Sequence, residues 1–238
     1  MINLNQSIKE LNYCIFDVET TGLDYKNDQM IEIAAIKSDF YGNVIDVFEQ
    51  KIKLYKKEEL PLEIVELTKI KKEDLENANA IKDVLIEFLE FIENSILVAQ
   101  NADFDMSFLI YGCLEELNTI ISPVNIDLIN LSKNLFPQKS SYKLKELVKY
   151  YEIIFDEDKH HRALYDCEIT LECLIKALIK YESYDLKELL AINNTKMATE
   201  KQYNYLNSLI EKKDINFIDD QLLTIKSCSI IIDYLKEI

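Results

Sequence analysis

The order of apolar and polar residues along the chain predicts several strands followed by an alternation of strands and helices. Residues 12–19, NYCIFDVE, are rich in residues that favour β-structure, and similar runs cover 29–40 and 43–54, separated by a Tyr-Gly-Asn turn. These three runs predict an antiparallel meander. The short apolar segments SILVAQ at 95–100 and VNIDL at 124–128 predict two further strands.

Helical patterns fill the intervals after the meander, and they are expected at 62–68, 81–93, 104–117, 128–136, 143–151 and 162–182. The last pattern is the clearest, because its apolar residues recur at alternating steps of three and four. These residues are Leu164, Cys167, Leu171, Leu174, Leu178 and Tyr181. The whole order of elements predicts an α/β sheet with helices on its faces.

The chain becomes polar after residue 181, and we place a domain boundary between 183 and 197, dividing the chain into 1–184 and 185–238. Thr199 and Gln202 have the spacing of a capping box that starts a helix. We expect two or three short helices in the last forty residues, too small for a substantial core unless they are docked or helped by partners. The segment QLLTI at 221–225 faintly resembles a sliding-clamp peptide, but it also suits a turn leading to a helix capped by Thr224.

The composition narrows the class of protein. With 48% hydrophobic residues in 238, the chain can build an ordinary globular core. Its five cysteines are scattered and form no C-x-x-C pair, which fits reduced intracellular thiols better than disulfides or a zinc site. No signal-like N-terminus or membrane-spanning apolar run is present, so we expect a cytoplasmic protein with no membrane partner.

A net charge of −16 argues against a protein that holds nucleic acid through a broad basic surface. It does not exclude an enzyme whose positive charge comes from bound metal ions, because clustered carboxylates would then belong to the site itself. The distribution of acidic residues therefore matters more than their number.

Two carboxylates fall on one side of the first predicted strand. Asp17 and Glu19 are two residues apart, and the period of a strand points both side chains to the same face. Two solvated acids at a strand edge would be an unremarkable alternative. The apolar neighbours Ile15, Phe16 and Val18 instead predict a central strand, where unpaired acids are costly.

A third carboxylate follows the strand at 95–100. Asp105 lies at the carboxyl end of that strand and near the start of the next helix, a position where α/β proteins place ligands and where an anion is tolerated. Helix capping is the alternative use of an acid here, and we assign it to Asp103 or Asn101. Periodicity alone leaves the choice between Asp103 and Asp105 open.

The only two histidines, His160 and His161, precede a helix that carries Asp166. Residues five apart on one helix diverge, so His161 and Asp166 converge only if the histidine lies in the loop or first turn. Two solvent-exposed histidines would be the alternative. Together with the other carboxylates, the arrangement suits hydrolysis assisted by two Mg²⁺ or Mn²⁺ ions, with a histidine accepting the proton of water. Zinc fits this oxygen-rich set less well.

Three segments together resemble the three motifs of the DEDDh family of 3′-to-5′ exonucleases: FDVETTGLD at 16–24, LVAQNADFDMSFL at 97–109 and HRALYDCEIT at 161–170. The resemblance covers about residues 10–182. Within the family, the chain is most similar to the epsilon proofreading subunit of bacterial DNA polymerase III and to PolC-type exonuclease domains. It implies a ribonuclease H-like fold, a mixed five-stranded sheet flanked by helices, with the C-terminal helices as a small appendage.

The resemblance also implies roles for individual residues. The family's second motif selects Asp105 over Asp103, and its third motif selects His161 over His160 as general base. Asp17 is expected to contact both ions. In another branch of the superfamily, a tyrosine four residues before the last aspartate takes the role of the histidine. That position is Arg162 in this chain, so Tyr165 is not a rival base. The implied metal ligands are Asp17, Glu19, Asp105 and Asp166.

Substrate contacts are implied at the turn after the first strand and at the second motif. The backbone at Thr20, Thr21 and Gly22 resembles the turn that receives the 3′ end, and Leu23 matches a residue that wedges against terminal bases. The second motif adds Asn101 and Phe108. Helical spacing favours core packing for Phe108 and for Phe104, whereas exposure would let such rings stack on bases.

Three positions invite comparison with the family pattern. Gln100 replaces a histidine that commonly precedes N-A in the second motif, and Lys69 stands where glycine is usual. Both are expected to alter substrate preference without removing a metal ligand. Asp127 matches a recurrent family aspartate and is expected to have a structural or supporting role.

The implied activity is hydrolysis at 3′ ends of single-stranded or frayed DNA, releasing nucleoside monophosphates in replication proofreading or repair. RNA is an alternative substrate, because related families trim RNA 3′ ends, and a replicative polymerase or another replication or repair protein is an expected partner. A catalytically idle nucleic-acid-processing subunit that keeps the fold is the remaining alternative, and the complete set of five site residues speaks against it.

Overall fold

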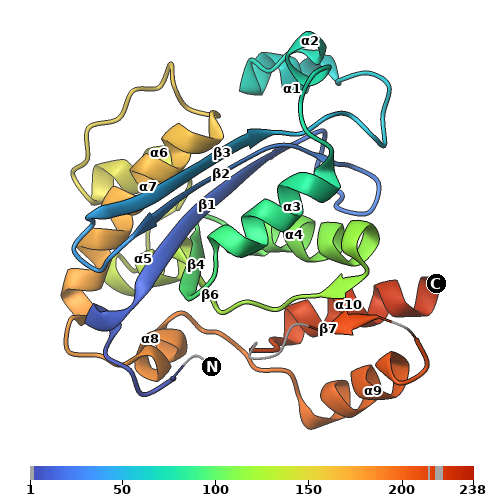
Figure 1. The fold of residues 1–238 in the computed structure, drawn as a ribbon. Helices are drawn as coiled ribbons and strands as arrows, with labels where there is room; N and C mark the ends of the chain where they lie inside the picture. Colours follow the sequence, from blue (N-terminus) through green and yellow to red (C-terminus); the bar gives the residue numbers. More distant parts are fainter. Residues whose placement is uncertain (1–2, 214, 218–221) are drawn as a thin grey trace.

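The computed structural model describes residues 3–213, 215–217 and 222–238. Five strands form one sheet in the order β3-β2-β1-β4-β6 (Figure 1). Strands β1 to β3 form an antiparallel meander, and β4 and β6 run parallel to β1. The predicted mixed five-stranded sheet is therefore confirmed. The strands are β1 (Asn12–Thr20), β2 (Met30–Ser38), β3 (Val44–Lys51), β4 (Ser95–Ala99) and β6 (Asn125–Asp127).

Helices follow the strands in the predicted order, with two short helices, at Lys72–Leu75 and at Leu186–Ile192, that the sequence pattern did not reveal. The second of these lies within the segment 183–197 where the domain boundary was placed. The predicted helix at 162–182 ends as a 3-10 turn over Ile179–Tyr181. Strands β5 (Thr119–Ile120) and β7 (Asn216–Phe217) form a separate two-stranded sheet. The helices are α1 (Leu62–Thr68), α2 (Lys72–Leu75), α3 (Ile81–Phe91), α4 (Ala102–Leu117), α5 (Leu128–Leu135), α6 (Leu144–Tyr150), α7 (Ala163–Leu178), α8 (Leu186–Ile192), α9 (Glu200–Ile210) and α10 (Ile225–Glu237).

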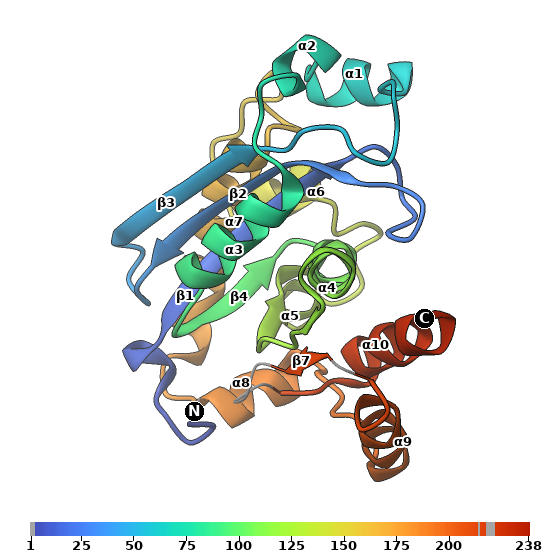
Figure 2. The same cartoon turned by 45° about the vertical axis from the view of Figure 1, so that its right-hand side comes forward.

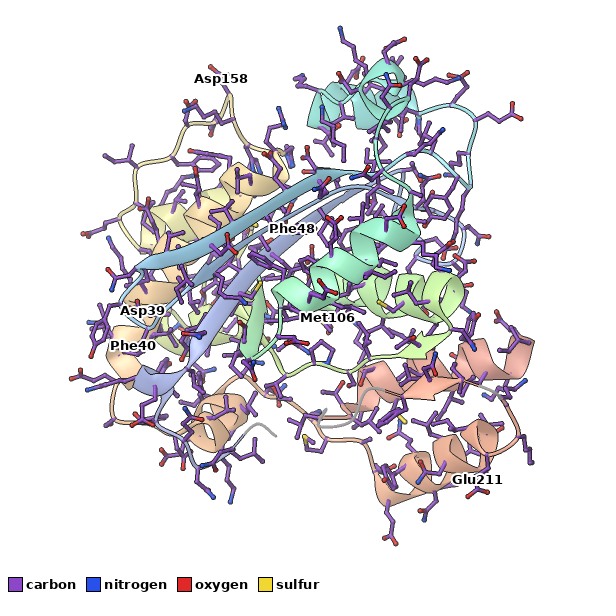
Figure 3. All side chains as sticks on the ribbon, viewed as in Figure 1. Asp39, Phe40, Phe48, Met106, Asp158 and Glu211 are labelled. Atoms are coloured by element: carbon purple, nitrogen blue, oxygen red, sulfur yellow. The ribbon has the colours of Figure 1, made fainter. Side chains whose placement is uncertain are left out.

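The central sheet separates two hydrophobic cores, because alternate residues of β1 face opposite sides. Cys14 and Phe16 pack with α3 and α4, whereas Tyr13 and Ile15 pack with α5 and α7. Figures 1 and 2 show α3 on one face of the strands and α7 on the other. In Figure 3 the label of Phe48, a member of the first core, lies where β3 passes α3.

Helix α7 crosses the sheet close to the backbone of β2. The small side chain of Ala34 lies under it, and the thiol of Cys167 donates to the Ala34 carbonyl at 3.4 Å. Both residues are fully buried. This contact brings the start of α7 beside the end of β1, so residues far apart in the chain meet at one edge of the sheet.

The C-terminal helices are docked on the rest of the chain. In α8, Leu186 and Leu189 join the core beneath α7. Helix α10 packs along α4 through Ile231, and the ring of Tyr234 meets Tyr111 edge-on at 5.7 Å. Figure 2 shows α9 and α10 below α4. The packing supplies the docking that such short helices need, and the boundary after residue 184 stays a prediction.

Two capping boxes begin the last two helices. Thr199 caps α9 with Gln202, as predicted, and Thr224 caps α10 with Ser227. The helix-start interpretation of QLLTI is therefore confirmed at Thr224, while Gln221, which the sliding-clamp resemblance requires, lies outside the described residues. A helix long and apolar enough to cross a membrane is not found within the described ranges.

The docking of α10 predicts the effect of a cavity in this interface. Ile231→Ala removes a fully buried side chain and should lower the free energy of unfolding by about 2–5 kcal/mol. The same substitution at Ile225, which is 37% exposed at the start of α10, should cost much less. Urea unfolding followed by circular dichroism measures both. A separate early transition in Ile231→Ala would show that residues 185–238 unfold independently, as the predicted boundary implies.

Candidate active site

The end of β1 gathers carboxylates from separate elements. Asp17 and Glu19 lie on the side of the sheet that faces α7, and Asp166 lies in the first turn of α7. One oxygen from each of these three carboxylates lies within 4.8 Å of the other two. Glu19 and Asp166 are only 8% and 6% exposed, so the cluster is largely removed from solvent. Strand spacing predicted the first pair, and the structure places Asp166, the ligand implied by the third motif, beside it.

Asp105 reaches the same strand from the opposite face. Its side chain lies in the first turn of α4 and accepts the backbone N–H of Val18 at 3.2 Å. Since Val18 lies between Asp17 and Glu19, this hydrogen bond ties Asp105 to the acidic end of β1. All four predicted carboxylates therefore converge.

The capping prediction at the start of α4 is wrong in its mechanism. Asn101 holds the N-cap position, but its side chain makes no capping hydrogen bond within the described chain. Asp103 instead turns outward and pairs with Lys226 of α10 at 2.6 Å. The carboxylate of Asp103 is therefore paired with a side chain of α10 instead of with a backbone N–H at the start of α4.

Crowding and burial make the acidic cluster unfavourable when all its members are charged. Burial, followed by the charges of Asp105, Glu19, Asp166 and Glu32, raises the pKa of Asp17 well above its ordinary value. Burial and the charges around it raise the pKa of Glu19 to about 9. Burial also raises the pKa of Asp105 to about 7, although the Val18 N–H opposes this shift.

This chemistry fits divalent cations. Nearby cations favour charged carboxylates and would relieve the repulsion that raises these pKa values. The ligand atoms at β1 are carboxylate oxygens, the type that Mg²⁺ and Mn²⁺ prefer, whereas zinc favours histidine and cysteine. The four carboxylates therefore form a candidate metal site.

Both histidines contact Asp166. The backbone N–H of His161 donates to one carboxylate oxygen at 3.2 Å, and Nδ1 of His160 lies 2.8 Å from the other. The two rings stack at 3.8 Å. His161 lies in the loop before α7, as the sequence predicted, with a left-handed φ of 66°. Sequence reasoning missed the contact between His160 and Asp166, because adjacency in the chain does not show which ring turns inward.

The surroundings of His161 keep its ring neutral. Burial, followed by the charge of His160, lowers the pKa of His161, and Asp166 opposes this shift. A neutral imidazole retains the lone pair that a general base requires. The ring at 161 therefore has suitable electrostatics for accepting a proton.

The loop before the histidines is anchored by an aromatic residue of α7. The hydroxyl of Tyr165 accepts the backbone N–H of Asp156 at 2.7 Å, and its ring lies 6.0 Å from that of Phe155. Asp158 marks the exposed outer part of this loop in Figure 3. Tyr165 thus has a structural task, in keeping with its exclusion as a base.

The turn after β1 is held by its own side chains. The Thr20 hydroxyl donates to the Gly22 carbonyl at 2.6 Å, and the Thr21 hydroxyl accepts the N–H of Gln29 at 3.1 Å and donates to Asp28 at 3.2 Å. A Cβ at Gly22 would overlap the Asp28 carboxylate. This packing explains the glycine and fixes the turn directly beyond Glu19.

Of the other three predicted substrate residues, two are exposed and one is buried. Leu23 is 85% exposed at the tip of the turn, and Asn101 is also exposed. Phe108 is 3% exposed and packs in the core of α4, 5.0 Å from the partly exposed ring of Phe104. The burial of Phe108 supports the core-packing alternative.

The three positions compared with the family pattern have local structural roles. Lys69 takes a left-handed φ of 62° at the end of α1, a conformation that glycine adopts without strain. The Gln100 amide donates to the Tyr142 carbonyl at 2.8 Å. Asp127 caps α5 through the Ile129 N–H at 2.8 Å, and burial raises its pKa to about 7. The structural role expected of Asp127 is confirmed.

Sequence reasoning missed one buried acid, Glu32 of β2. It is paired with Glu19 in the strand register, is fully buried, and accepts the Ala163 N–H at 3.3 Å. The Arg162 guanidinium lies 3.5 Å from its other oxygen. The signal was present in MIEIAAI, since a single acid in an apolar strand requires a partner.

The sheet order and the acidic cluster at the end of β1 define a nuclease of the DEDDh type with a ribonuclease H-like fold. The model of the exonuclease family RNase_T matches residues 14–174. The chain belongs to this exonuclease family, as the three motifs predicted.

Curated relatives include PolC-type DNA polymerases III. The chain is 40% identical over 173 residues to that of Bacillus subtilis (strain 168), covering 72% of this chain and 12% of the polymerase. It is 34% identical over 213 residues to that of Clostridium perfringens (strain 13 / Type A), covering 90% of this chain and 14% of the polymerase. The chain thus spans about one eighth of the length of these relatives.

Solved structures confirm the ribonuclease H-like fold. The nuclease domain of 3'hExo, a DEDDh family member bound to rAMP, superposes with a TM-score of 0.62 at 18% identity, covering 71% of this chain and 92% of that one. E. coli Exonuclease I in complex with a dA16 oligonucleotide gives a TM-score of 0.63 at 16% identity, covering 74% of this chain and 43% of that one.

The raised pKa values predict how pH affects the metal-free protein. The folded chain holds protons on Glu19 up to about pH 9 and on Asp105 up to about pH 7, whereas the unfolded chain releases them near 4.5 and 3.8. The contribution of these two groups to stability is therefore fully present below the unfolded values and is lost as pH rises through the folded values of about 7 and 9. Thermal unfolding in EDTA should show a lower midpoint at pH 9 than at pH 6.

Variants and metal test the cause of this pH dependence. Glu19→Gln should flatten it, whereas Glu168→Gln, at an exposed position of α7, should not. Mg²⁺ should raise the midpoint at pH 9, because binding to the folded state stabilises it. A pH dependence equal in all three proteins would contradict an origin in the β1 carboxylates.

Proposed function

We propose that this chain is a metal-dependent 3′-to-5′ exonuclease that hydrolyses the terminal phosphodiester of single-stranded or frayed DNA and releases nucleoside monophosphates. The observation that carries the proposal is the meeting of Asp17, Glu19 and Asp166 within 4.8 Å, with Asp105 bonded to the intervening backbone and the histidines on Asp166. A solvated acidic surface would not bury these groups at the cost of raised pKa values.

The four carboxylates hold two Mg²⁺ or Mn²⁺ ions in this proposal. Asp17 would be the ligand shared by both ions, as the family resemblance implies; it lies on the central strand, where the charges of Asp105, Glu19 and Asp166 all act on it. Bound cations supply activation of the attacking water and stabilisation of the leaving oxygen. Burial of Glu19, Asp105 and Asp166 keeps their oxygens fixed and limits competition from water.

His161 is the proposed general base. The backbone hydrogen bond to Asp166 fixes its position beside the cluster, and its lowered pKa keeps the ring ready to accept a proton at neutral pH. His160 orients Asp166 through the contact at Nδ1. The two adjacent histidines therefore have different tasks, one chemical and one supporting.

The substrate's 3′ end is proposed to enter at the turn after β1. The hydroxyls of Thr20 and Thr21 form hydrogen bonds within the protein. We therefore propose that the backbone from Thr20 to Gly22, and not these hydroxyls, binds the terminal nucleotide. Leu23 projects into solvent, as a wedge between terminal bases must. Exposed Asn101 is proposed to contact the same end, with Phe108 supporting α4 from the core.

A role in DNA replication or repair follows from the PolC-type relatives, which are DNA polymerases by name. The matched part of each relative is short, which fits an exonuclease unit that serves a polymerase. We propose proofreading or a related 3′-end cleaning step, with a replicative polymerase or a repair protein as partner.

Digestion of 5′-labelled oligonucleotides tests the reaction and its substrate. With Mg²⁺ or Mn²⁺, single-stranded DNA should shorten stepwise from its 3′ end, blunt duplex should react more slowly, and EDTA should stop cleavage. A matched RNA strand should be degraded more slowly. Faster RNA cleavage would replace DNA by RNA as substrate, and no cleavage with either metal would favour a catalytically idle subunit.

Substitutions at the site should separate the ligands from the base. Asp17→Ala should lower turnover by orders of magnitude, and His161→Ala by about 10²-fold or more, as expected for loss of a general base. His160→Ala should cost much less. Single-turnover rates at saturating metal, with thermal midpoints as folding controls, measure these effects. Equal losses at the two histidines would contradict the assignment of His161 as base.

A further inference from the structure

We propose that Glu32 is a positioning residue that holds the segment from His160 to Ala163 in place, and with it the histidines and Asp166. The proposal rests on the proposed function only where a rate is measured. Glu32 lies outside the five-member set, and both of its carboxylate oxygens face the start of α7.

Glu32 is an acid without access to solvent. It lies in the second strand of the sheet between Ile31 and Ile33, and all three are fully buried. A carboxylate in such surroundings is strongly destabilising unless it is hydrogen-bonded and paired. Its Oε2 accepts a hydrogen bond, but its Oε1 has no hydrogen-bond partner among the described residues. The position therefore carries a large penalty that its contacts with α7 must offset.

Those contacts lie at the start of α7. Ala163 is the first residue of the helix, and its N–H has no partner within the helix. Arg162 occupies the N-cap position, and its side chain provides no capping hydrogen bond. Glu32 supplies the missing acceptor from β2, at 3.3 Å, and its negative charge suits the positive end of the helix. It acts as a cap delivered by tertiary structure.

The Arg162 guanidinium strengthens this attachment. It lies 3.5 Å from the Oε1 of Glu32 and 4.0 Å from a carboxylate oxygen of Glu49 on β3. The pair with Glu32 joins an exposed side chain to a fully buried one, since Arg162 is 45% exposed. Two consecutive residues, Arg162 and Ala163, are thus attached to one carboxylate.

The residue just before this attachment is strained. His161 has a φ of 66°, a region that non-glycine residues enter only when their surroundings hold them there. On its N-terminal side lie residues 156–159, which are exposed. The fixed point on its C-terminal side is the Glu32 attachment. Loss of that attachment would let His161 relax to an ordinary backbone conformation and turn both histidine rings away from Asp166.

The histidines themselves provide a direct readout, because the chain contains only two. In ¹H–¹³C spectra of metal-free protein, each ring gives one set of signals, which His160→Asn assigns. Glu32→Ala should shift both sets toward the values of unstructured histidine. Glu32→Gln keeps an acceptor for the Ala163 N–H and should shift them less. Glu49→Gln, which removes the charge of the other acid beside Arg162, should leave them unchanged.

Kinetics provide the second readout. Glu32→Ala should lower kcat about 10–100-fold, the usual cost of losing a residue that orients a site. The KM for a DNA oligonucleotide should change much less, since the hydrogen bond and the ion pair of Glu32 go to the start of α7 and not to the turn proposed to receive the 3′ end. Glu32→Gln should recover part of kcat. A purely structural defect would appear as a lowered thermal midpoint and would not explain this recovery.

The histidine spectra test the role of Glu32 independently of whether the protein is an exonuclease. Unchanged histidine signals in folded Glu32→Ala and Glu32→Gln would overturn it, as would shifts of equal size in Glu49→Gln. If wild-type protein cleaves no nucleic acid, the proposed function fails while the histidine spectra still judge Glu32. If cleavage is present and KM rises as kcat stays constant, Glu32 acts on substrate binding and the positioning role is wrong.

Discussion

Mutual repulsion among buried carboxylates is the constraint on which this structure depends. Asp17, Glu19 and Asp166 bring three carboxyl groups into one small, largely buried space, and burial, followed by the charges of neighbouring acids, raises the pKa values of Asp17 and Glu19. An arrangement that costs free energy in the metal-free chain persists only if the surrounding fold imposes it. The two hydrophobic cores, one on each face of the sheet, provide that rigid surrounding and leave the charges for cations to neutralise.

Each element reaches the cluster through a specific attachment. Helix α4 is joined to β1 by the hydrogen bond from Val18 to Asp105, and α7 lies close over β2 because Ala34 is small. Glu32 then receives the start of α7. Each of these contacts joins two different elements. The distances between the site residues therefore depend on the order of the strands in the sheet as much as on the motif residues.

Much of the fold was predictable because its signals are local. Alternating residues revealed the meander, helical spacing revealed α7, and the two-residue spacing of Asp17 and Glu19 placed both on one face. The predictions that were wrong or incomplete concern contacts between distant segments. Asn101 does not cap α4 with its side chain, and the contact between His160 and Asp166 was not foreseen. Glu32 escaped notice because its partners lie about 130 residues away in the chain.

The sequence by itself determined most of the elements, the shared face of Asp17 and Glu19 and the family to which the chain belongs, since backbone periodicity and motif spacing are properties of neighbouring residues. Tertiary structure alone decided which acids meet, how each histidine contacts Asp166 and how the strained backbone at His161 is held. Burial and charge repulsion act through space between residues that the chain order keeps apart, and only the packed sheet and helices set those distances.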